Sequence, residues 1–178
     1  KELKFQGIEL HNIHNRLFTD KDGAFHDYAA AKTVRKLYEK KLSIPCIDTI
    51  CNLADKNNET ETIAEIEKCI EIASNLHIPY VRVKAFGEEN YAYVKAIIAK
   101  ILPMAEQNGI VILAETSGIF ANTKELCELL DSFAHDNFAA LWDMYATYFD
   151  GEETPETTIK NLGAYVKHVH IKDAVKTE

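Results

Sequence analysis

Hydrophobic and polar positions follow two alternating patterns along the chain. Apolar runs of six or seven residues, typical of strands, are separated by longer segments whose apolar residues recur at helical spacing. The runs predict strands at residues 5–10, 44–50, 78–84, 110–115, 138–143 and 165–170, and the segments between them predict helices at residues 28–41, 59–76, 90–107, 123–133 and 154–162. One strand followed by five helix–strand pairs predicts a parallel sheet with helices outside it.

Turn and cap residues support these boundaries. Asn108 and Gly109 form a turn that ends the helix before them, and Asn122 is a helix-capping residue. Pro155 stands at the first position of the last helix, where its missing N–H is tolerated. Residues 11–27 are polar, contain three histidines and are predicted to form a long loop.

The predicted sheet could close in two ways, as an open doubly wound sheet or as an eight-stranded barrel. No glycine-rich phosphate-binding fingerprint follows a predicted strand, which argues against a dinucleotide-binding sheet. Charged residues at the C-terminal ends of successive strands favour a barrel, because barrel active sites lie at that rim. We therefore expect the α/β class and a (β/α)8 TIM barrel that is incomplete, with about strands two to seven present.

The domain prediction follows from the strand count. Six strands are found where a barrel needs eight, and the next strand end would fall near residue ~200, beyond Glu178. A strand before Phe5 is also required, and Lys1 begins the chain without a methionine. We expect residues 1–178 to form a single domain that is truncated at both ends.

Composition narrows the class of partner. The 178 residues are 47% hydrophobic and 27% charged, which is ordinary for a globular protein. A net charge of −8 argues against nucleic acid, which needs Lys and Arg on one face. No apolar stretch approaches the ~20 residues of a membrane span, and no signal peptide is visible. The four cysteines form no CxxC pair and are typical of buried thiols, so a cytoplasmic protein is expected.

Three residues with metal-binding side chains recur at nearly equal intervals, each at the end of a predicted strand. Glu115, Asp143 and His170 are separated by 28 and 27 residues, about one strand–helix unit of a parallel sheet. Residues two apart in a strand share a face, so apolar side chains lie below both carboxylates on the inner face. A single carboxylate after an apolar run often only solvates a strand end or caps a helix. Three such residues in register, the third a histidine, favour a metal site.

Several motifs carry a resemblance to a known family. The chain resembles the xylose isomerase-like TIM-barrel superfamily (AP endonuclease family 2). Three of its segments resemble motifs of that superfamily: Leu113-Ala114-Glu115-Thr116, Leu141-Trp142-Asp143 and His168-Val169-His170-Ile171-Lys172-Asp173. Two more resemble its second and fourth strands: Gly7-Ile8-Glu9-Leu10 and Val81-Arg82-Val83. The likeness runs along nearly the whole chain. The superfamily includes sugar-phosphate isomerases and epimerases, ketose 3-epimerases, inosose dehydratases and endonuclease IV-like proteins. The resemblance therefore implies a TIM barrel that acts in carbohydrate metabolism.

Site residues are implied by position in the resemblance. Glu115, Asp143 and His170 would be metal ligands. The family's usual fourth ligand, a Glu on the eighth strand, has no counterpart among these residues, and Ala146 stands where many members have a His. Lys172 is expected to face substrate oxygens.

Four further polar residues are candidates for the rim of the pocket. Asp173 would orient the rim beside the histidine ligand. Glu9, His11 and His14 follow the second strand of the barrel and are predicted to contribute to substrate binding. For the two histidines, a solvated loop is the alternative interpretation.

The predicted chemistry follows from the ligand types. Oxygen and imidazole ligands without thiolate suit Mn²⁺, Mg²⁺, Co²⁺ or Zn²⁺. The resemblance implies that such an ion chelates vicinal oxygens of a ketose or polyol and polarises the carbonyl, which acidifies the adjacent C–H. Glu115 is then the candidate for ligand and catalytic base together. The predicted function is a metal-dependent isomerase or epimerase whose partner is a small sugar or sugar phosphate.

Two alternatives stay open. A metal-dependent phosphodiesterase of the endonuclease IV type would need more His and acidic ligands than these, and the net charge is unsuited to DNA. The other alternative is a catalytically inactive, truncated member of the family. Its two open sheet edges would invite pairing with another chain and so produce a homo-oligomer.

Overall fold

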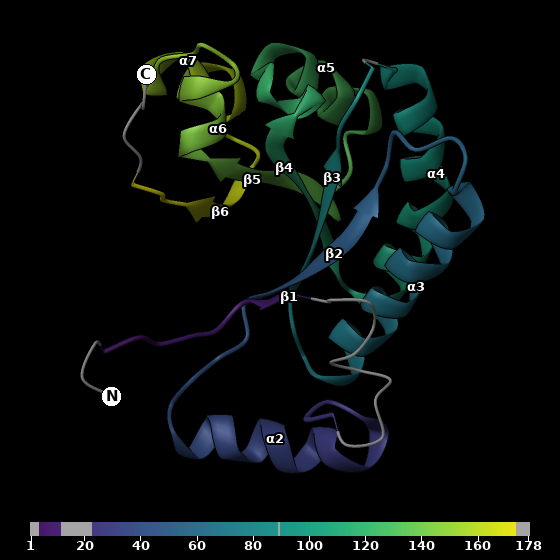
Figure 1. Ribbon diagram of the computed structural model, residues 1–178, viewed down its shortest axis with the longest axis vertical. Coiled ribbons are helices and arrows are strands. Elements are labelled where there is room, and N and C mark those ends of the chain that lie inside the picture. Colours follow the sequence, from purple (N-terminus) through teal and green to yellow (C-terminus); the bar gives the residue numbers. More distant parts are fainter. Residues whose placement is uncertain (1–3, 12–22, 89, 174–178) are drawn as a thin grey trace.

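The chain forms one curved parallel sheet whose strands lie in the order of the sequence (Figure 1). The computed structural model describes residues 4–11, 23–88 and 90–173. The strands are β1 (Leu10–His11), β2 (Cys46–Asn52), β3 (Tyr80–Ala85), β4 (Val111–Gly118), β5 (Phe138–Asp143) and β6 (Val166–His170). Each strand pairs in parallel with the next, which gives an open half-barrel with a concave and a convex face.

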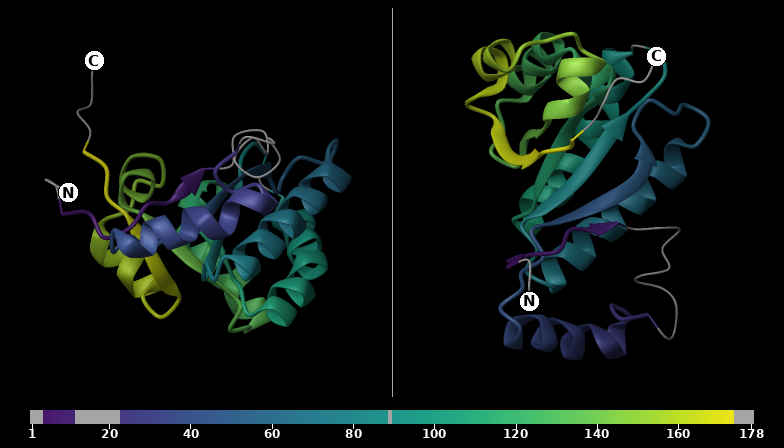
Figure 2. Two further views of the ribbon diagram at one scale, coloured as in Figure 1. Left: turned by 90° about the horizontal axis from the view of Figure 1, so that it is seen from below. Right: turned by 60° about the vertical axis from the view of Figure 1, so that its left-hand side comes forward.

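Helices follow the strands as the periodicity predicts. They are α2 (Asp27–Glu39), α3 (Glu59–Asn75), α4 (Tyr91–Asn108), α5 (Thr123–Phe133), α6 (Met144–Phe149) and α7 (Pro155–Leu162), with a 3₁₀ turn, η1, at Ile119–Ala121. Figure 2 shows α3 and α4 side by side along the convex face of the sheet, while α2 stands apart at one end. None of the described helices is long and apolar enough to cross a bilayer.

The core has two layers, one on each face of the sheet. The larger layer lies between the sheet and the helices and includes the fully buried Ile47, Ile70 and Ile98. The smaller layer lies on the other face and consists of Leu113, Ala139 and Leu141, with Tyr80 and Val111 packed against them. This second cluster agrees with the predicted alternation, which places apolar side chains below the carboxylates of β4 and β5 on the inner face.

The bounds of several elements differ from the sequence prediction. For example, β4 continues past Glu115 to Gly118, and β2 ends at Asn52 and not at Ile50. Two elements differ more strongly. The first strand shrinks from residues 5–10 to Leu10–His11, because only β2 pairs with it and the preceding residues make just one isolated bridge, Gly7 to Ser43. The second difference is α6, a helix of six residues in a segment where no helix was predicted. Asp143 starts this helix, because its Oδ1 accepts hydrogen bonds from the N–H groups of the first turn.

Three of the described glycines have a positive φ, and two of them, Gly109 and Gly118, end a helix and a strand, respectively. Gly109 ends α4 with a φ of 66°, which confirms the predicted stop. Gly118 ends β4 with a φ of 58° and a ψ of −129°, where the chain turns from β4 into η1. A Cβ at Gly118 would lie 2.2 Å from the carbonyl oxygen of Ala85 on β3. The close approach of β3 and β4 at the site end of the sheet therefore requires glycine.

The cysteines are free thiols, as predicted. Cys46, Cys51 and Cys69 are buried, and Cys127 is half-buried. Burial raises the pKa of Cys51 to about 12, so this thiol stays protonated and packs as an apolar group.

Candidate metal centre

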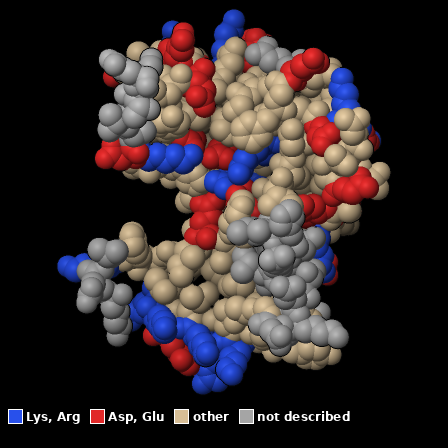
Figure 3. Space-filling view, in the orientation of Figure 1, with Lys and Arg blue, Asp and Glu red and all other residues tan. Residues whose placement is uncertain are grey.

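Ionisable side chains from every strand converge on the concave face of the sheet. They are Glu9 just before β1, Asp48 on β2, Arg82 and Lys84 on β3, Glu115 on β4, Asp143 on β5, and His168, His170 and Lys172 on or after β6. Figure 3 shows acidic and basic side chains lying next to one another in the hollow in the middle of the molecule. The carboxyl ends of parallel strands meet at one rim, so this is the expected place for a site.

Glu115, Asp143 and His170 form one group at this rim. Each offers a ligand atom, and these atoms all lie within 4.8 Å of one another. Oε1 of Glu115 is 3.4 Å from Nδ1 of His170. Asp143 and His170 pair directly in the register of β5 and β6, while Glu115 pairs with Leu141, two residues before Asp143. The structure therefore brings together the three residues predicted as metal ligands.

The side chain of Thr116 on β4 and the first turn of α6 hold Asp143 in place. The hydroxyl of Thr116 accepts a hydrogen bond from the Asp143 N–H at 2.8 Å, which ties β5 to β4 beside the site. Oδ1 accepts from the N–H groups of Tyr145 and Ala146, both at 3.1 Å, so Oδ2 is the oxygen that faces the cluster. Burial raises the pKa of Asp143, but the ammonium of Lys172 on Oδ2 and the helix N–H groups lower that pKa by more. The net pKa is below the ordinary value, so the carboxyl stays ionised.

Arg82 is the central cation of the cluster. Its Nε donates to Oδ1 of Asp48 at 2.8 Å and its Nη2 contacts Oδ2 of the same carboxylate, a bidentate contact. Its Nη1 lies 3.5 Å from Glu115 and 3.4 Å from Glu9. Burial lowers the pKa of Arg82, but the carboxylates, led by Asp48, raise it more, so the guanidinium stays charged. One fixed cation thus holds three carboxylates from three parts of the sheet.

His170 lies between two carboxylates. Its Nε2 is 2.8 Å from Oε2 of Glu9, and its Nδ1 faces Glu115. The contact with Glu115, followed by that with Glu9, raises the pKa of His170 to about 9 against the opposing effect of burial. For Glu9 the balance is similar. Burial raises its pKa, but the hydrogen bond with His170 and the charge of Arg82 lower it below the ordinary value.

Comparisons with known proteins show the family and the fold of the chain. The sequence matches the family described as xylose isomerase-like TIM barrel over residues 1–178. The chain belongs to this family. The predicted family is thereby confirmed, as is the predicted fold, an α/β barrel of which six parallel strands are present. No curated protein sequence matches the chain at a significant level.

Solved structures of the same fold belong to chains that are longer than this xylose isomerase-like chain. A xylose isomerase domain protein from Planctomyces limnophilus superimposes with a TM-score of 0.83 at 17% identity, over 99% of this chain and 67% of that one. The D-psicose 3-epimerase of Clostridium cellulolyticum H10, solved with D-tagatose, gives 0.78 at 12% identity, over 95% and 63%. A xylose isomerase-like TIM barrel protein from Mycobacterium smegmatis, solved with magnesium, gives 0.75 at 14%, over 96% and 63%. The chain thus spans about two thirds of the length of these proteins.

The donor set of this xylose isomerase-like site fits a divalent cation. Two carboxylates and an imidazole are ligands that Mg²⁺, Mn²⁺, Co²⁺ and Zn²⁺ accept, and ligand atoms around one such ion lie about 3 to 4 Å apart. The separation of Oε1 of Glu115 and Nδ1 of His170, 3.4 Å, is of this order, and all three ligand atoms lie within 4.8 Å of one another. The described cluster also holds four carboxylates against three permanent cations, Arg82, Lys84 and Lys172. A divalent ion that displaces the proton of His170 would therefore enter a site with a net negative charge.

The other predicted site residues are placed as follows. Glu9 contacts His170, and Lys172 contacts Asp143. His11 is half-exposed, and its Nδ1 contacts Asp48. Asp173 is exposed after β6, and His14 lies outside the described residues. Geometry alone assigns none of these side chains to a substrate, and their roles stay predictions.

Sequence reasoning missed Asp48, Arg82 and Lys84 as members of the site. The signal was present, because Arg82 and Lys84 alternate with apolar residues in β3 and Asp48 interrupts an apolar run in β2. A charge inside a buried strand needs an opposite charge on a neighbouring strand. Which strands are neighbours becomes certain only from the sheet order.

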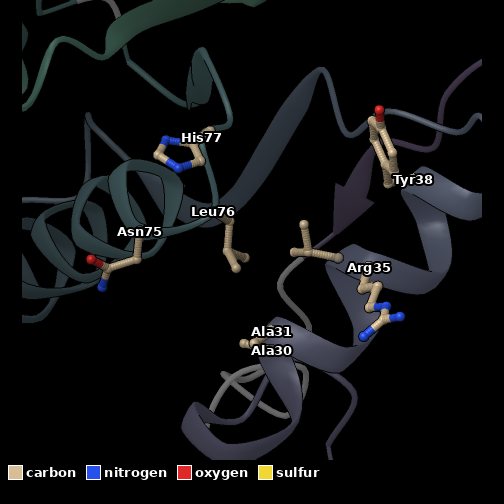
Figure 4. Close-up of a pocket in the computed structure, with 8 residues that line it drawn as sticks. Ala30, Ala31, Arg35, Tyr38, Asn75, Leu76 and His77 are labelled. Atoms are coloured by element: carbon tan, nitrogen blue, oxygen red, sulfur yellow. The ribbon is translucent and has the colours of Figure 1, made fainter.

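A second hollow lies far from these side chains and lacks their chemistry. Figure 4 shows it between α2 and the end of α3, lined by Ala30, Ala31, Val34, Arg35, Tyr38, Asn75, Leu76 and His77. No carboxylate lines it, and the guanidinium of Arg35 is paired with Glu39 at 3.1 Å. We therefore place the candidate site at the strand ends.

Proposed function

We propose that residues 1–178 belong to a single barrel domain that isomerises or epimerises a sugar or sugar phosphate with the help of a divalent metal ion. The observation that carries this proposal is the convergence of Glu115, Asp143 and His170 at the carboxyl ends of adjacent strands. Membership of the xylose isomerase-like family and the fold shared with a ketose 3-epimerase support the reaction class.

The three converging residues would hold the ion. Glu115 and Asp143 would each supply one oxygen, Oδ2 in the case of Asp143, and His170 would supply Nδ1, the nitrogen that faces Glu115. When bound, a divalent ion polarises the carbonyl of a ketose and lowers the pKa of the neighbouring C–H. Mn²⁺, Mg²⁺, Co²⁺ and Zn²⁺ all satisfy this donor set, and the sequence does not select among them.

Glu115 is the residue that we assign to proton transfer. It is buried on β4, three residues before that strand ends at Gly118, and directs its carboxylate to the concave face, where a substrate carbonyl would lie beside the ion. Its carboxylate would take the proton from the carbon next to the carbonyl, and a proton returned to that carbon from the other face would give the epimer. Lys172, with its ammonium at the rim, would donate hydrogen bonds to hydroxyl or phosphate oxygens of the substrate.

The test is the substitution Glu115→Gln in the full-length protein. A glutamine keeps the shape of the side chain but cannot take a proton, so we expect epimerisation to fall by about 10² to 10⁴-fold. Glu106→Gln is the matched control, because Glu106 has an exposed carboxylate near the end of α4, which lies 3.6 Å from His135 and takes no part in the cluster. Ketoses can be screened by the exchange of deuterium from solvent into carbon-bound positions.

Two results would contradict the proposal. Retained epimerisation by the Glu115→Gln variant would remove the assigned base. Cleavage of DNA at abasic sites by the parent protein, without exchange into any ketose, would instead favour the phosphodiesterase alternative. The acidic cluster and the net charge of −8 argue against that outcome.

A further inference from the structure

Glu9 and His170 contact one another across the open side of the half-barrel. Glu9 lies just before the first strand and His170 ends the last, 161 residues later, yet Oε2 of Glu9 and Nε2 of His170 are 2.8 Å apart. The two strands are not hydrogen-bonded neighbours, since β1 and β6 are the opposite ends of the sheet. The contact therefore depends on the curvature of the sheet, and it closes the cluster on the side away from Glu115.

The two ring nitrogens of His170 face different partners. Nε2 faces the carboxylate of Glu9, while Nδ1 lies 3.4 Å from Oε1 of Glu115 and 3.1 Å from Nη1 of Arg82. An ionised carboxylate only accepts hydrogen bonds, and a neutral imidazole has one N–H. Nε2 is at hydrogen-bond distance from Glu9, whereas Nδ1 is farther from Glu115 and within reach of the Arg82 donor, so the N–H belongs on Nε2. A neutral imidazole that donates from Nε2 has its lone pair on Nδ1, which is the nitrogen directed at the proposed ligand group.

We propose that Glu9 is a positioning residue that holds His170 in the Nε2–H tautomer and so presents Nδ1 to a metal ion. This inference rests on the proposed metal site, and it gives Glu9 a role other than the substrate contact that the sequence suggested. Histidine ligands commonly donate their second N–H to a carboxylate, which orients the ring and makes the ligating nitrogen more basic. The Glu9 carboxylate meets that description by its charge, its distance and the nitrogen that it contacts.

Glu9 is itself held from two further directions. Nη1 of Arg82 is 3.4 Å from Oε1, and Nε2 of His168 is 3.5 Å from Oε2. Arg82 in turn is fixed by its bidentate contact with Asp48. The carboxylate that orients His170 is thus anchored to β2 and β3 through one guanidinium and to β6 through a second imidazole.

Another arrangement of the same side chains must be distinguished by experiment. Glu9, His168 and His170 could themselves offer three ligand atoms within 4.8 Å of one another. We favour positioning because the separation between Glu9 and His170 has the length of an ordinary hydrogen bond, and because one histidine would otherwise serve two ions. The two arrangements predict one and two bound metal ions, respectively.

The experiment measures Zn²⁺ binding to the full-length protein by calorimetry, for the parent and for Glu9→Ala, Glu9→Gln and Glu106→Gln. We expect one Zn²⁺ per parent chain and a loss of affinity of about 10- to 100-fold in Glu9→Ala. Glutamine offers a neutral acceptor of the same length, so Glu9→Gln should recover part of this loss. The Glu106→Gln variant, which changes an exposed carboxylate at the end of α4, should bind Zn²⁺ as the parent does.

A spectroscopic readout separates positioning from a general structural effect. In the Zn²⁺-loaded, ¹⁵N-labelled parent, long-range ¹H–¹⁵N correlations should show His170 protonated at Nε2 and bound through Nδ1. Three results would overturn the inference: unchanged Zn²⁺ affinity in Glu9→Ala, an Nδ1–H tautomer in the parent, or two Zn²⁺ ions of which Glu9→Ala loses one. A parent that gives the expected binding and tautomer but epimerises no sugar would overturn the proposed function and leave the role of Glu9 intact.

Discussion

Arg82 and Asp48 form a buried bidentate ion pair between β3 and β2, with Nε of the guanidinium 2.8 Å from Oδ1 of the carboxylate. Asp48 is only 1% exposed and Arg82 11%. Two buried groups of opposite charge stabilise the fold only as long as both are present, because removing one leaves the other without compensation in a poorly hydrated place. The pair is therefore the support on which the more open part of the cluster rests.

Replacing Arg82 should destabilise the protein. Arg82→Met leaves Asp48 with only Lys84 and His11 among its described partners, and we expect the free energy of unfolding to fall by about 3 kcal/mol. Urea denaturation of the full-length protein measures this change. Arg35→Met is the control, because Arg35 is 81% exposed in its pair with Glu39 and such pairs contribute roughly 0 to 1 kcal/mol. Equal stability of the two variants would show that the buried pair is not a support.

The same carboxylate should make stability depend on acid. Burial raises the pKa of Asp48, but the hydrogen bond and charge of Arg82, with the charge of Lys84, lower it below its ordinary value. A carboxyl whose folded pKa is depressed stabilises the fold above its unfolded pKa, near 3.9, and this contribution is lost as the pH falls through the folded pKa. Urea midpoints between pH 7 and pH 2.5 should therefore drop more steeply below about pH 4 for the parent than for Asp48→Asn. Parallel curves would show that Asp48 is not the group that titrates.

Lys172 should affect metal binding and catalysis in opposite directions. Its ammonium contacts Oδ2 of Asp143, the oxygen proposed for the metal, and at 53% exposure its charge is partly screened by water. Lys172→Met removes a cation beside a divalent ion, so the Kd for Mn²⁺ should fall by roughly threefold to tenfold. Turnover of a ketose should fall as well if Lys172 binds substrate oxygens. Binding can be measured from the spectrum of the free Mn²⁺ ion. If the Lys172→Met variant binds Mn²⁺ more weakly than the parent, Lys172 orients Asp143 instead.

Gly109 and Gly118, which both have a positive φ, should respond differently to alanine. At Gly109 nothing lies within 4 Å of an added Cβ, so only the conformational cost of about 1 kcal/mol is expected. At Gly118 the added Cβ would lie 2.2 Å from a carbonyl oxygen of β3, and we expect a loss of about 3 kcal/mol or more. Thermal melting of the two variants gives the comparison. Gly118→Ala should also weaken metal binding, because Glu115 lies three residues earlier in the same strand.

Much of the fold follows from the sequence because long periodic segments leave few alternatives. The helix at residues 123–133 and the strand at residues 138–143 have the predicted bounds. The short helix α6 was missed because six residues are too few to show a periodicity. Its start at Asp143 also shows that one carboxylate can cap a helix and join a ligand group, two interpretations that the sequence treated as alternatives.

The candidate ligands could be found from spacing, whereas their supports could not. Glu115, Asp143 and His170 stand at equivalent points of successive strand–helix units, and a parallel sheet brings such points together. The contact of Glu9 with His170 depends on how strongly the sheet curves, which no local pattern encodes. The role of Arg82 depends in the same way on three neighbours that are distant in sequence.

The strand order has a consequence for how the protein is made. Every strand pairs with the one synthesised just before it, so the sheet can grow in a single direction as the chain leaves the ribosome. Among the proposed ligands, His170 is synthesised last, with β6, whereas its partner Glu9 is synthesised just before β1. An ion that needs His170 held by Glu9 could bind only after β6 has been synthesised and has joined the sheet. Metal binding would then stabilise the folded protein only at the end of folding. In metal-depleted cells the protein would be less stable and more readily degraded.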